Sequence, residues 1–292
     1  MFRATAAIHR ADHVYAFMGP SPGCLTQEFR DSRDFNEWGL CDLRCARLMS
    51  CWLVRERHIL ATSKKRRQDI VEKRELDAVV QDIYRKTYDL WEANRRQLAK
   101  HDHGFKILYG PPFFEPHVLV LALQPGGNAS HVKAAELRQP ASSNEYLSEA
   151  WPLAAELRKR LGRGYLQNAV GTNAIFFRAP NWGEWQEIER GLRTRLEEFS
   201  LNQNKRLIEA MRPKHLLLLG WDTLDLMGGS GFRELVANRL GNGRPHRKRL
   251  LQSGRIEGVP AYAIPHPSAA WKNPPVTDDD WQLIAAGLGA TN

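Results

Sequence analysis

The chain has 292 residues, of which 42% are hydrophobic, and a formal net charge of +9. This length allows one large domain with extensions or two modest domains, and the hydrophobic share is sufficient for a buried core. No stretch approaches the roughly 20 apolar residues of a membrane span, and the N-terminus lacks the apolar core of a secretory signal. We therefore expect a cytoplasmic protein with no membrane partner. The basic excess fits a polyanionic partner such as DNA or RNA, and it fits a role in solubility equally well.

The four cysteines all lie in the first 51 residues, at Cys24, Cys41, Cys45 and Cys51. No two of them form a Cys-x-x-Cys pair, so the spacing is not that of a structural zinc site. Reduced thiols are the expected state in the cytoplasm. We predict neither a metal nor another cofactor.

Residues 1–50 mix Gly, Pro, Arg and Asp without a steady period, and the basic run "SKKRR" follows at 63–67, which predicts an irregular or poorly ordered basic extension over 1–68. Residues 69–103 have a helical period, with charges between the periodic positions, and predict an amphipathic helix that packs on the core. Those positions are Leu76, Val80, Ile83, Thr87, Leu90, Asn94 and Leu98. An exposed apolar stripe on this helix would instead favour dimerisation. No obligate protein partner is evident.

From residue 104 to residue 292, short apolar runs alternate with amphipathic segments. The alternation predicts an α/β fold, with three α/β/α layers around a central parallel four-stranded sheet. Ligands of such sheets bind beyond the carboxyl ends of the strands. The expected strands cover 117–123, 168–177, 214–219 and 260–264, and the expected helices cover 144–162, 184–211, 222–239 and 278–288.

The first of these strand ends has almost no side chains: Gln124, Pro125, Gly126, Gly127 and Asn128 follow the apolar run. Glycines let backbone N–H groups approach a ligand and leave room for a flat group. An ordinary tight turn explains the same residues. A dinucleotide site is not expected, because neither a GxGxxG fingerprint nor a GxxxxGK phosphate loop is present.

The other strand ends offer two polar candidates. Asn173 lies among apolar neighbours, and its amide suits a nucleobase edge or, alternatively, neighbouring backbone groups. Gly220 ends the third strand and has the features of a structural residue. His266 follows the fourth strand between two prolines, which hold an imidazole in one place as a catalytic group requires.

Taken in order, "LALQPGG", "GTNAIFFRAP", "RPKHLLLLG" and "IPHPSAAW" resemble the successive motifs of the uracil-DNA glycosylase superfamily, over roughly Pro116 to Trp271. The resemblance implies an enzyme that flips a nucleotide out of DNA, hydrolyses its N-glycosidic bond and leaves an abasic site. It also implies that Asn173 reads the flipped pyrimidine and that His266 hydrogen-bonds the base oxygen that gains charge. The wall of the base pocket would be Pro125, Gly126 and Gly127.

The resemblance further implies contacts with DNA. Ser268 would touch a backbone phosphate, and Trp271 would insert into the vacated base stack. Arg178 is a candidate for another phosphate contact. The run "RPHRKR" supplies Arg244, Arg247, Lys248 and Arg249, which would grip phosphates or form an ordinary solvated loop.

Two departures from the family pattern bear on activity. Many members carry Asp or Asn before the proline to position or activate water, whereas this chain has Gln124, with Asn128 as a nearby polar substitute. Gln cannot act as a base, although its carbonyl can orient a water. In addition, some branches hold an iron–sulfur cluster through four cysteines, and no cysteine lies beyond residue 104. We expect a cluster-free enzyme.

A third departure bears on the substrate. Strict uracil enzymes place a bulky aromatic just after the proline, and here Gly126 is followed by Gly127. This predicts a 5-modified pyrimidine as substrate, including the glucosylated hydroxymethylcytosine of some phages, and hence a role in antiphage defence. The prediction fails if a loop such as 131–146 fills the space. Open alternatives are a repair glycosylase for uracil or mismatched thymine, a catalytically silent nucleic-acid-binding relative, and an RNA- or nucleotide-directed enzyme.

Overall fold

The computed structural model describes residues 38–127, 130, 134–238, 248–267 and 276–290, with side chains described except at 38–67, 234–238 and 248–250. The chain divides into two units, Met1–Leu60 and Ala61–Asn292. In the described part of the chain, no helix is both long enough and apolar enough to cross a membrane.

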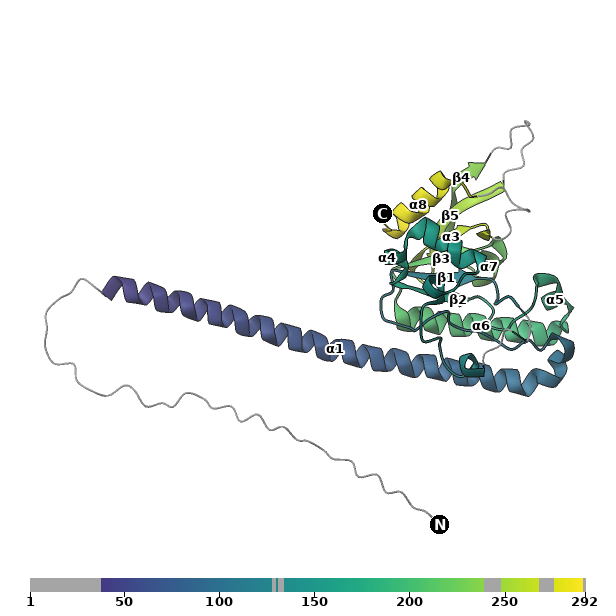
Figure 1. The fold of residues 1–292 in the computed structure, drawn as a ribbon, viewed down its shortest axis with the longest axis horizontal. Coiled ribbons are helices and arrows are strands. Elements are labelled where there is room, and N and C mark those ends of the chain that lie inside the picture. The colour runs from purple at the N-terminus through teal and green to yellow at the C-terminus, as the bar shows by residue number, and fades with distance from the viewer. Residues whose placement is uncertain (1–37, 128–129, 131–133, 239–247, 268–275, 291–292) are drawn as a thin grey trace, which may run out of the picture. The chain divides into compact units, whose positions relative to one another are not determined.

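Helix α1 runs from Trp38 to Leu98 (Figure 1). It begins well inside the segment 1–68, which the sequence predicts to be irregular. Residues 38–98 contain no proline and are rich in Leu and Arg, both good helix formers, so continuous helix is favoured without a steady apolar period. The side chains of α1 that enter the core of the second unit begin at Leu76.

The centre of the second unit is a sheet in the order β2-β1-β3-β6-β5-β4. Strands β2 (Ala169–Asn173), β1 (Val118–Ala122), β3 (His215–Leu219) and β6 (Val259–Ile264) are parallel to one another. The predicted α/β fold with a parallel four-stranded centre is therefore confirmed. Their carboxyl ends lie at one edge of the sheet, since Ala122 pairs with Asn173 and Leu219 with Ile264.

The sheet has six strands, not four, because an antiparallel pair extends it beyond β6. Strands β4 (Ser230–Asn238) and β5 (Lys248–Ile256) form this pair. The helix predicted over 222–239 is accordingly wrong beyond α7 (Trp221–Met227). The helix ends because Gly228, with a φ of 65°, adopts a left-handed conformation and is followed by another glycine.

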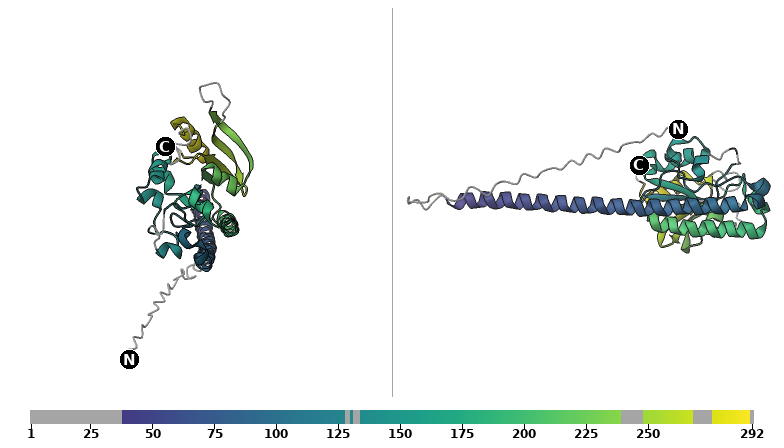
Figure 2. Two further views of the ribbon diagram at one scale, coloured as in Figure 1. Left: turned by 90° about the vertical axis from the view of Figure 1, so that its right-hand side faces the viewer. Right: turned by 90° about the horizontal axis from the view of Figure 1, so that it is seen from below.

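Helices cover both faces of the sheet, as the three-layer prediction requires. Alternate residues of the central strands point to opposite faces: Leu119 and Leu121 join one buried cluster, and Val118 and Val120 the other. The first cluster includes side chains of α1, α7 and α6 (Arg190–Met211), and Figures 1 and 2 show α6 alongside the C-terminal part of α1. The second cluster includes side chains of α3 (Pro152–Leu161), α4 (Arg163–Leu166) and α8 (Asp278–Leu288).

Helix α8 has the predicted bounds, because a capping box between Thr277 and Asp280 defines its start. The other two predicted helices are interrupted. Segment 144–162 contains α2 (Glu145–Ser148), a break, and α3 with Pro152 in its first turn. Segment 184–211 is divided between α5 (Trp182–Glu187) and α6, because Ile188 adopts an extended conformation. Short 3-10 helices cover Ala99–His101 and Ala134–Leu137.

Candidate functional site

A cavity of about 510 Å³ opens where β1, β2 and β6 end. Its volume falls within the ~300–1,000 Å³ typical of small-molecule sites, and its position is the one expected for an open α/β sheet. Gln124 comes to it from the end of β1, Arg178 from beyond β2 and His266 from beyond β6. The remaining lining residues are Lys106, Tyr109, Ala122, Gly126, Gly127, Glu136, Glu145, Tyr146, Glu149, Trp151, Pro152 and Leu153.

The two glycines of the turn after β1 differ in their conformational requirements. Gly127 has a φ of 94°, in the left-handed region that favours glycine. Gly126 lies outside that region, and a Cβ atom added to it would meet no atom within 4 Å. The missing side chain at Gly126 therefore leaves open space at the cavity wall, whereas Gly127 is required by the backbone.

Arg178 holds this turn against the segment that follows β2. Its Nη1 donates a hydrogen bond to the Gly126 carbonyl oxygen over 2.7 Å, and the side chain is only 7% exposed. Its Nε atom is buried without a hydrogen-bond partner among the described residues. The side chain is therefore part of the cavity wall, and its contact with a DNA phosphate stays a prediction.

Gln124 also carries an unsatisfied polar atom. Its Oε1 is buried and has no hydrogen-bond partner in the described part of the chain. A buried carbonyl oxygen without a donor costs about 1–3 kcal/mol. The atom is therefore suited to accept a hydrogen bond from a water or from an N–H group bound in the cavity.

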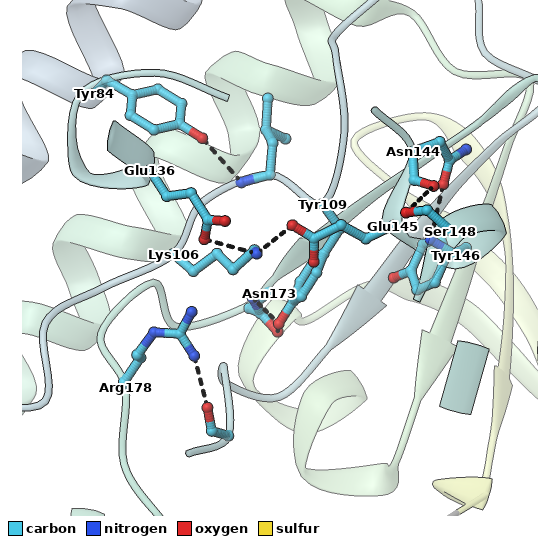
Figure 3. Close-up of polar contacts among 12 residues, drawn as sticks. Tyr84, Lys106, Tyr109, Glu136, Asn144, Glu145, Tyr146, Ser148, Asn173 and Arg178 are labelled. Atoms are coloured by element: carbon cyan, nitrogen blue, oxygen red, sulfur yellow. Dashed lines mark hydrogen bonds and ion pairs between the residues drawn. The ribbon is translucent and has the colours of Figure 1, made fainter. Parts of the chain in front are cut away.

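Asn173 lies behind the cavity wall rather than in it. It is fully buried, and its Nδ2 donates to the Tyr109 hydroxyl oxygen over 3.1 Å, while that hydroxyl lies 3.3 Å from Asn173 Oδ1 and donates to it. Asn204 Nδ2 fixes the same strand end by donating to the Asn173 carbonyl oxygen over 2.9 Å. The Asn173 amide, expected to read the base, therefore does not line the cavity itself, but is hydrogen-bonded to Tyr109, which does (Figure 3).

Tyr109 belongs to an aromatic wall. Its ring is stacked on that of Tyr146, with centroids 5.9 Å apart and 23° between the planes. The ring centroid of Trp151 lies 5.7 Å from that of Tyr109 and 5.5 Å from that of Tyr146. Burial raises the pKa of Tyr109 to about 12, which keeps its hydroxyl protonated and able to donate. Such a wall suits a flat heterocycle or the apolar face of a sugar.

A buried ion cluster adjoins the aromatic wall (Figure 3). Lys106 Nζ lies 2.9 Å from Glu136 Oε2 and 2.5 Å from Glu145 Oε1, and the lysine is 5% exposed. The same ammonium lies 4.9 Å from the centroid of the Tyr109 ring. The two carboxylates hold the Lys106 side chain in one position at the cavity wall.

His266 is placed by the ends of β3 and β6. Gly220, at the end of β3, donates its backbone N–H to the Ile264 carbonyl oxygen over 2.7 Å. A Cβ atom added to Gly220 would lie at ordinary van der Waals distance, 3.6 Å, from His266 Cβ, so it is the φ of 99°, and not a lack of space, that favours glycine here. Burial lowers the pKa of His266, which favours a neutral imidazole at pH 7.

The structure therefore brings five of the predicted site residues to one cavity: Gln124, Gly126, Gly127, Arg178 and His266. Pro125 is buried behind the turn and is not part of the lining. Lys248 and Arg249 begin β5, but their side chains are not described. Five further predictions lie outside the described residues: Asn128, Ser268, Trp271, Arg244 and Arg247.

The described part of the segment 131–146, residues 134–146, borders the cavity. Residues 131–133 are not described, whereas Glu136, Glu145 and Tyr146 are lining residues around the remaining volume. Sequence reasoning missed these three together with Lys106, Tyr109, Glu149 and Trp151. One signal was present: Lys106 interrupts the apolar run of 105–109, and a charge in such a run indicates a buried partner.

Comparison with known proteins identifies no family. The sequence matches no family model, and a search of curated proteins finds no significant match. Within the described residues, no group of three or more His, Cys, Asp or Glu side chains is arranged to hold a metal ion.

Proposed function

We propose that this chain is a DNA glycosylase that flips a pyrimidine into the cavity beyond β1 and β6 and hydrolyses its N-glycosidic bond. The observation that carries the proposal is the coincidence, around one 510 Å³ cavity, of an aromatic wall, His266 and a turn without a side chain at Gly126. The resemblance of four motifs to the uracil-DNA glycosylase superfamily supports it, since the strands carrying them are neighbours in one parallel sheet.

In this mechanism the flipped base lies against Tyr109 and Tyr146. As the N-glycosidic bond breaks, its electron pair passes to the base and the sugar becomes an oxocarbenium-like cation. Neutral His266 donates an N–H hydrogen bond to the base oxygen that gains charge, an interaction often worth about 3 kcal/mol. Gln124 Oε1 orients a water, whose oxygen bonds the sugar C1′ and whose proton leaves to solvent, while the departing base anion takes up a proton from solvent.

The proposed substrate is a 5-modified pyrimidine, because the space at Gly126 admits a substituent that an aromatic side chain would exclude. Glucosylated hydroxymethylcytosine in phage DNA is the proposed case, and the biological role that follows is antiphage defence. A repair glycosylase for uracil or mismatched thymine is the alternative within the same chemistry.

The test is the release of free base. The protein is incubated with DNAs that contain uracil, mispaired thymine, 5-hydroxymethylcytosine or its glucosylated form, and the soluble fraction is analysed by mass spectrometry. We expect the modified base in solution, abasic sites in the DNA, and at least about a hundredfold slower release by His266→Ala. Release of uracil alone would contradict the proposed substrate.

A binding protein without catalysis is the second candidate. Two observations favour it: Gln124 is not a base, and the nearby Glu136 and Glu145 are both engaged by Lys106. Intact DNA that is nevertheless bound would support this candidate. Gln124→Asp then provides the decisive comparison, because activity that appears only in this variant would identify the natural protein as a binder.

A further inference from the structure

A second, more polar cavity borders the first. It has a volume of about 250 Å³ and lies between the 3-10 helix Ala134–Leu137 and α2. The two cavities share Glu136, Glu145 and Glu149 as lining residues. The rest of the second lining consists of Ala135, Gln139, Pro140, Ala141, Ser142 and Ser143.

The charges at the shared boundary limit what this cavity can hold. Lys106 Nζ forms ion pairs with both Glu136 and Glu145. Glu149 forms no ion pair with any described residue. Arg158 is close to it, but donates to the Glu149 backbone carbonyl oxygen over 2.7 Å. An anionic ligand is disfavoured here, because it would face the Glu149 carboxylate at short range.

The hydrogen-bonding groups favour a ligand rich in hydroxyl groups. Carboxylate oxygens accept from hydroxyl donors, and the side chains of Gln139, Ser142 and Ser143 both donate and accept. A second observation indicates a ligand in the neighbouring first cavity: Arg178, only 7% exposed and part of its lining, has a buried Nε without a partner among the described residues. Two groups are therefore available to a ligand. One is a donor in the first cavity, Arg178 Nε, and the other is an acceptor at the boundary, the Glu149 carboxylate.

We propose that the second cavity binds an uncharged, hydroxyl-rich substituent, a hexose, carried on C5 of a pyrimidine that occupies the first cavity. This assignment rests on the proposed function for its base, and it adds a specificity-determining role for Glu149. Hydroxyl groups of the hexose donate to the Glu149 carboxylate. The base itself stays in the first cavity, where the aromatic wall and Gly126 are lining residues.

The test separates binding of the substituent from catalysis. Isothermal titration calorimetry with the full-length protein compares three nucleosides: 5-hydroxymethyl-2′-deoxycytidine, its glucosylated form and 5-aminomethyl-2′-deoxycytidine. We expect the glucosylated nucleoside to bind at least about tenfold more tightly than the hydroxymethyl form, since a hydrogen bond to a charged group contributes that much. Equal affinities, or tightest binding of the amine, would overturn the assignment.

Variants of Glu149 identify the residue responsible. Glu149→Leu removes both acceptor oxygens and is expected to lower the affinity ratio between glucosylated and hydroxymethyl nucleosides about tenfold. Glu149→Gln, which retains one acceptor, is expected to fall between this variant and the natural protein. The control is Glu198→Gln on the exposed face of α6, which leaves the ratio unchanged. A ratio that survives in Glu149→Leu would also overturn the assignment.

Base release from DNA distinguishes the two proposals. If no base is released while the preference for the glucosylated nucleoside persists, the glycosylase proposal fails and the hexose site stands. If bases are released but the nucleosides bind equally, the hexose site fails and the glycosylase stands.

Discussion

Lys106 shows how strongly single residues of this site depend on one another. Its ammonium lies within 2.9 Å of the Glu136 and Glu145 carboxylates, and all three side chains are largely removed from water. A buried ion pair contributes little net stability as a unit, but the loss of one member leaves uncompensated charge. Removal of the lysine would therefore leave two buried carboxylates without this counter-ion.

Replacing this lysine gives a clear prediction at the residue scale. Lys106→Met is expected to lower the free energy of unfolding by about 3–5 kcal/mol, as measured by urea denaturation. The control is Lys100→Met, whose exposed ion pair with Glu187 at 3.1 Å contributes at most about 1 kcal/mol. Recovery of stability in the double variant Lys106→Met, Glu145→Gln would assign the loss to uncompensated charge. Equal effects at Lys100 and Lys106 would contradict the argument.

His266 provides a prediction for pH. Burial lowers its pKa from the usual 6.5, so below pH 6.5 the unfolded chain binds more protons at this residue than the folded protein. The free energy of unfolding should therefore decrease as the pH falls from 6.5, and the decrease should be smaller in His266→Gln. Urea titrations of both proteins between pH 7.5 and about pH 5 measure the difference. Parallel curves would show that the imidazole is not protected from water in the folded state.

At the scale of elements, the turn after β1 contains two glycines with different roles: Gly127 is needed for its backbone conformation, and Gly126 leaves open space. Gly127→Ala is expected to cost about 1–2 kcal/mol of unfolding free energy, because its φ of 94° is unfavourable for any Cβ. Gly126→Ala is expected to change stability by less than ~0.5 kcal/mol, since its Cβ would meet no atom within 4 Å. Thermal or urea unfolding of the two variants tests the distinction, and equal losses would refute it.

The same turn predicts a specificity effect. Gly126→Phe places a ring in the open space at the cavity wall and is expected to reduce excision of a glucosylated base more than excision of uracil. The measured quantity is the ratio of kcat/KM for the two substrates, with Gly126→Ala as the matched control. An unchanged ratio in Gly126→Phe would exclude this turn from substrate selection.

The sequence predicts the elements whose signals are local. Strands β1, β3 and β6 are continuous apolar runs, and α8 begins at a capping box, so their bounds follow from the residues themselves. The end of α7 could have been predicted from Gly228 and Gly229, whereas strand β4 does not follow from the sequence, because its pairing with β5 is not a local signal. Its conformation is decided by the partner strand.

Some residues of the candidate site could likewise be predicted from the sequence, and others could not. Gln124 and His266 are predictable because the carboxyl ends of parallel strands converge. Tyr109, Tyr146 and Trp151 come from irregular segments and a short helix, where no periodicity indicates which side chains meet. The inward position of Asn173 was equally inaccessible, because it depends on the Tyr109 hydroxyl.

At the scale of the whole molecule, the charge is unevenly distributed. The chain carries a formal net charge of +9, while the first cavity is lined by two cations, Lys106 and Arg178, and three carboxylates. The described lining of this cavity thus lacks the positive excess of the whole chain. Under the proposed function, DNA phosphates would contact other parts of the protein, and the cavity would hold an uncharged base.

This distribution predicts how DNA binding responds to salt. Affinity should fall linearly with the logarithm of salt concentration, with a slope of about 0.9 for each phosphate neutralised. Arg247→Ala combined with Lys248→Ala should reduce the slope by about two if the basic run contacts DNA. Lys73→Ala combined with Lys205→Ala, on exposed faces of α1 and α6, removes the same charge as a control. Equal slopes for both pairs would place the phosphate contacts elsewhere.

Strands β5 and β6 are joined by the two-residue turn Glu257–Gly258, in which both residues have positive φ angles, 47° and 79°. This is the geometry of a tight hairpin turn matched to the twist of its strands. Such a hairpin closes in microseconds, whereas the parallel pairing of β1 with β2 and β3 requires closure of long intervening segments. The strand that leads directly to His266 is therefore expected to be paired early in folding, before the parallel centre of the sheet is assembled.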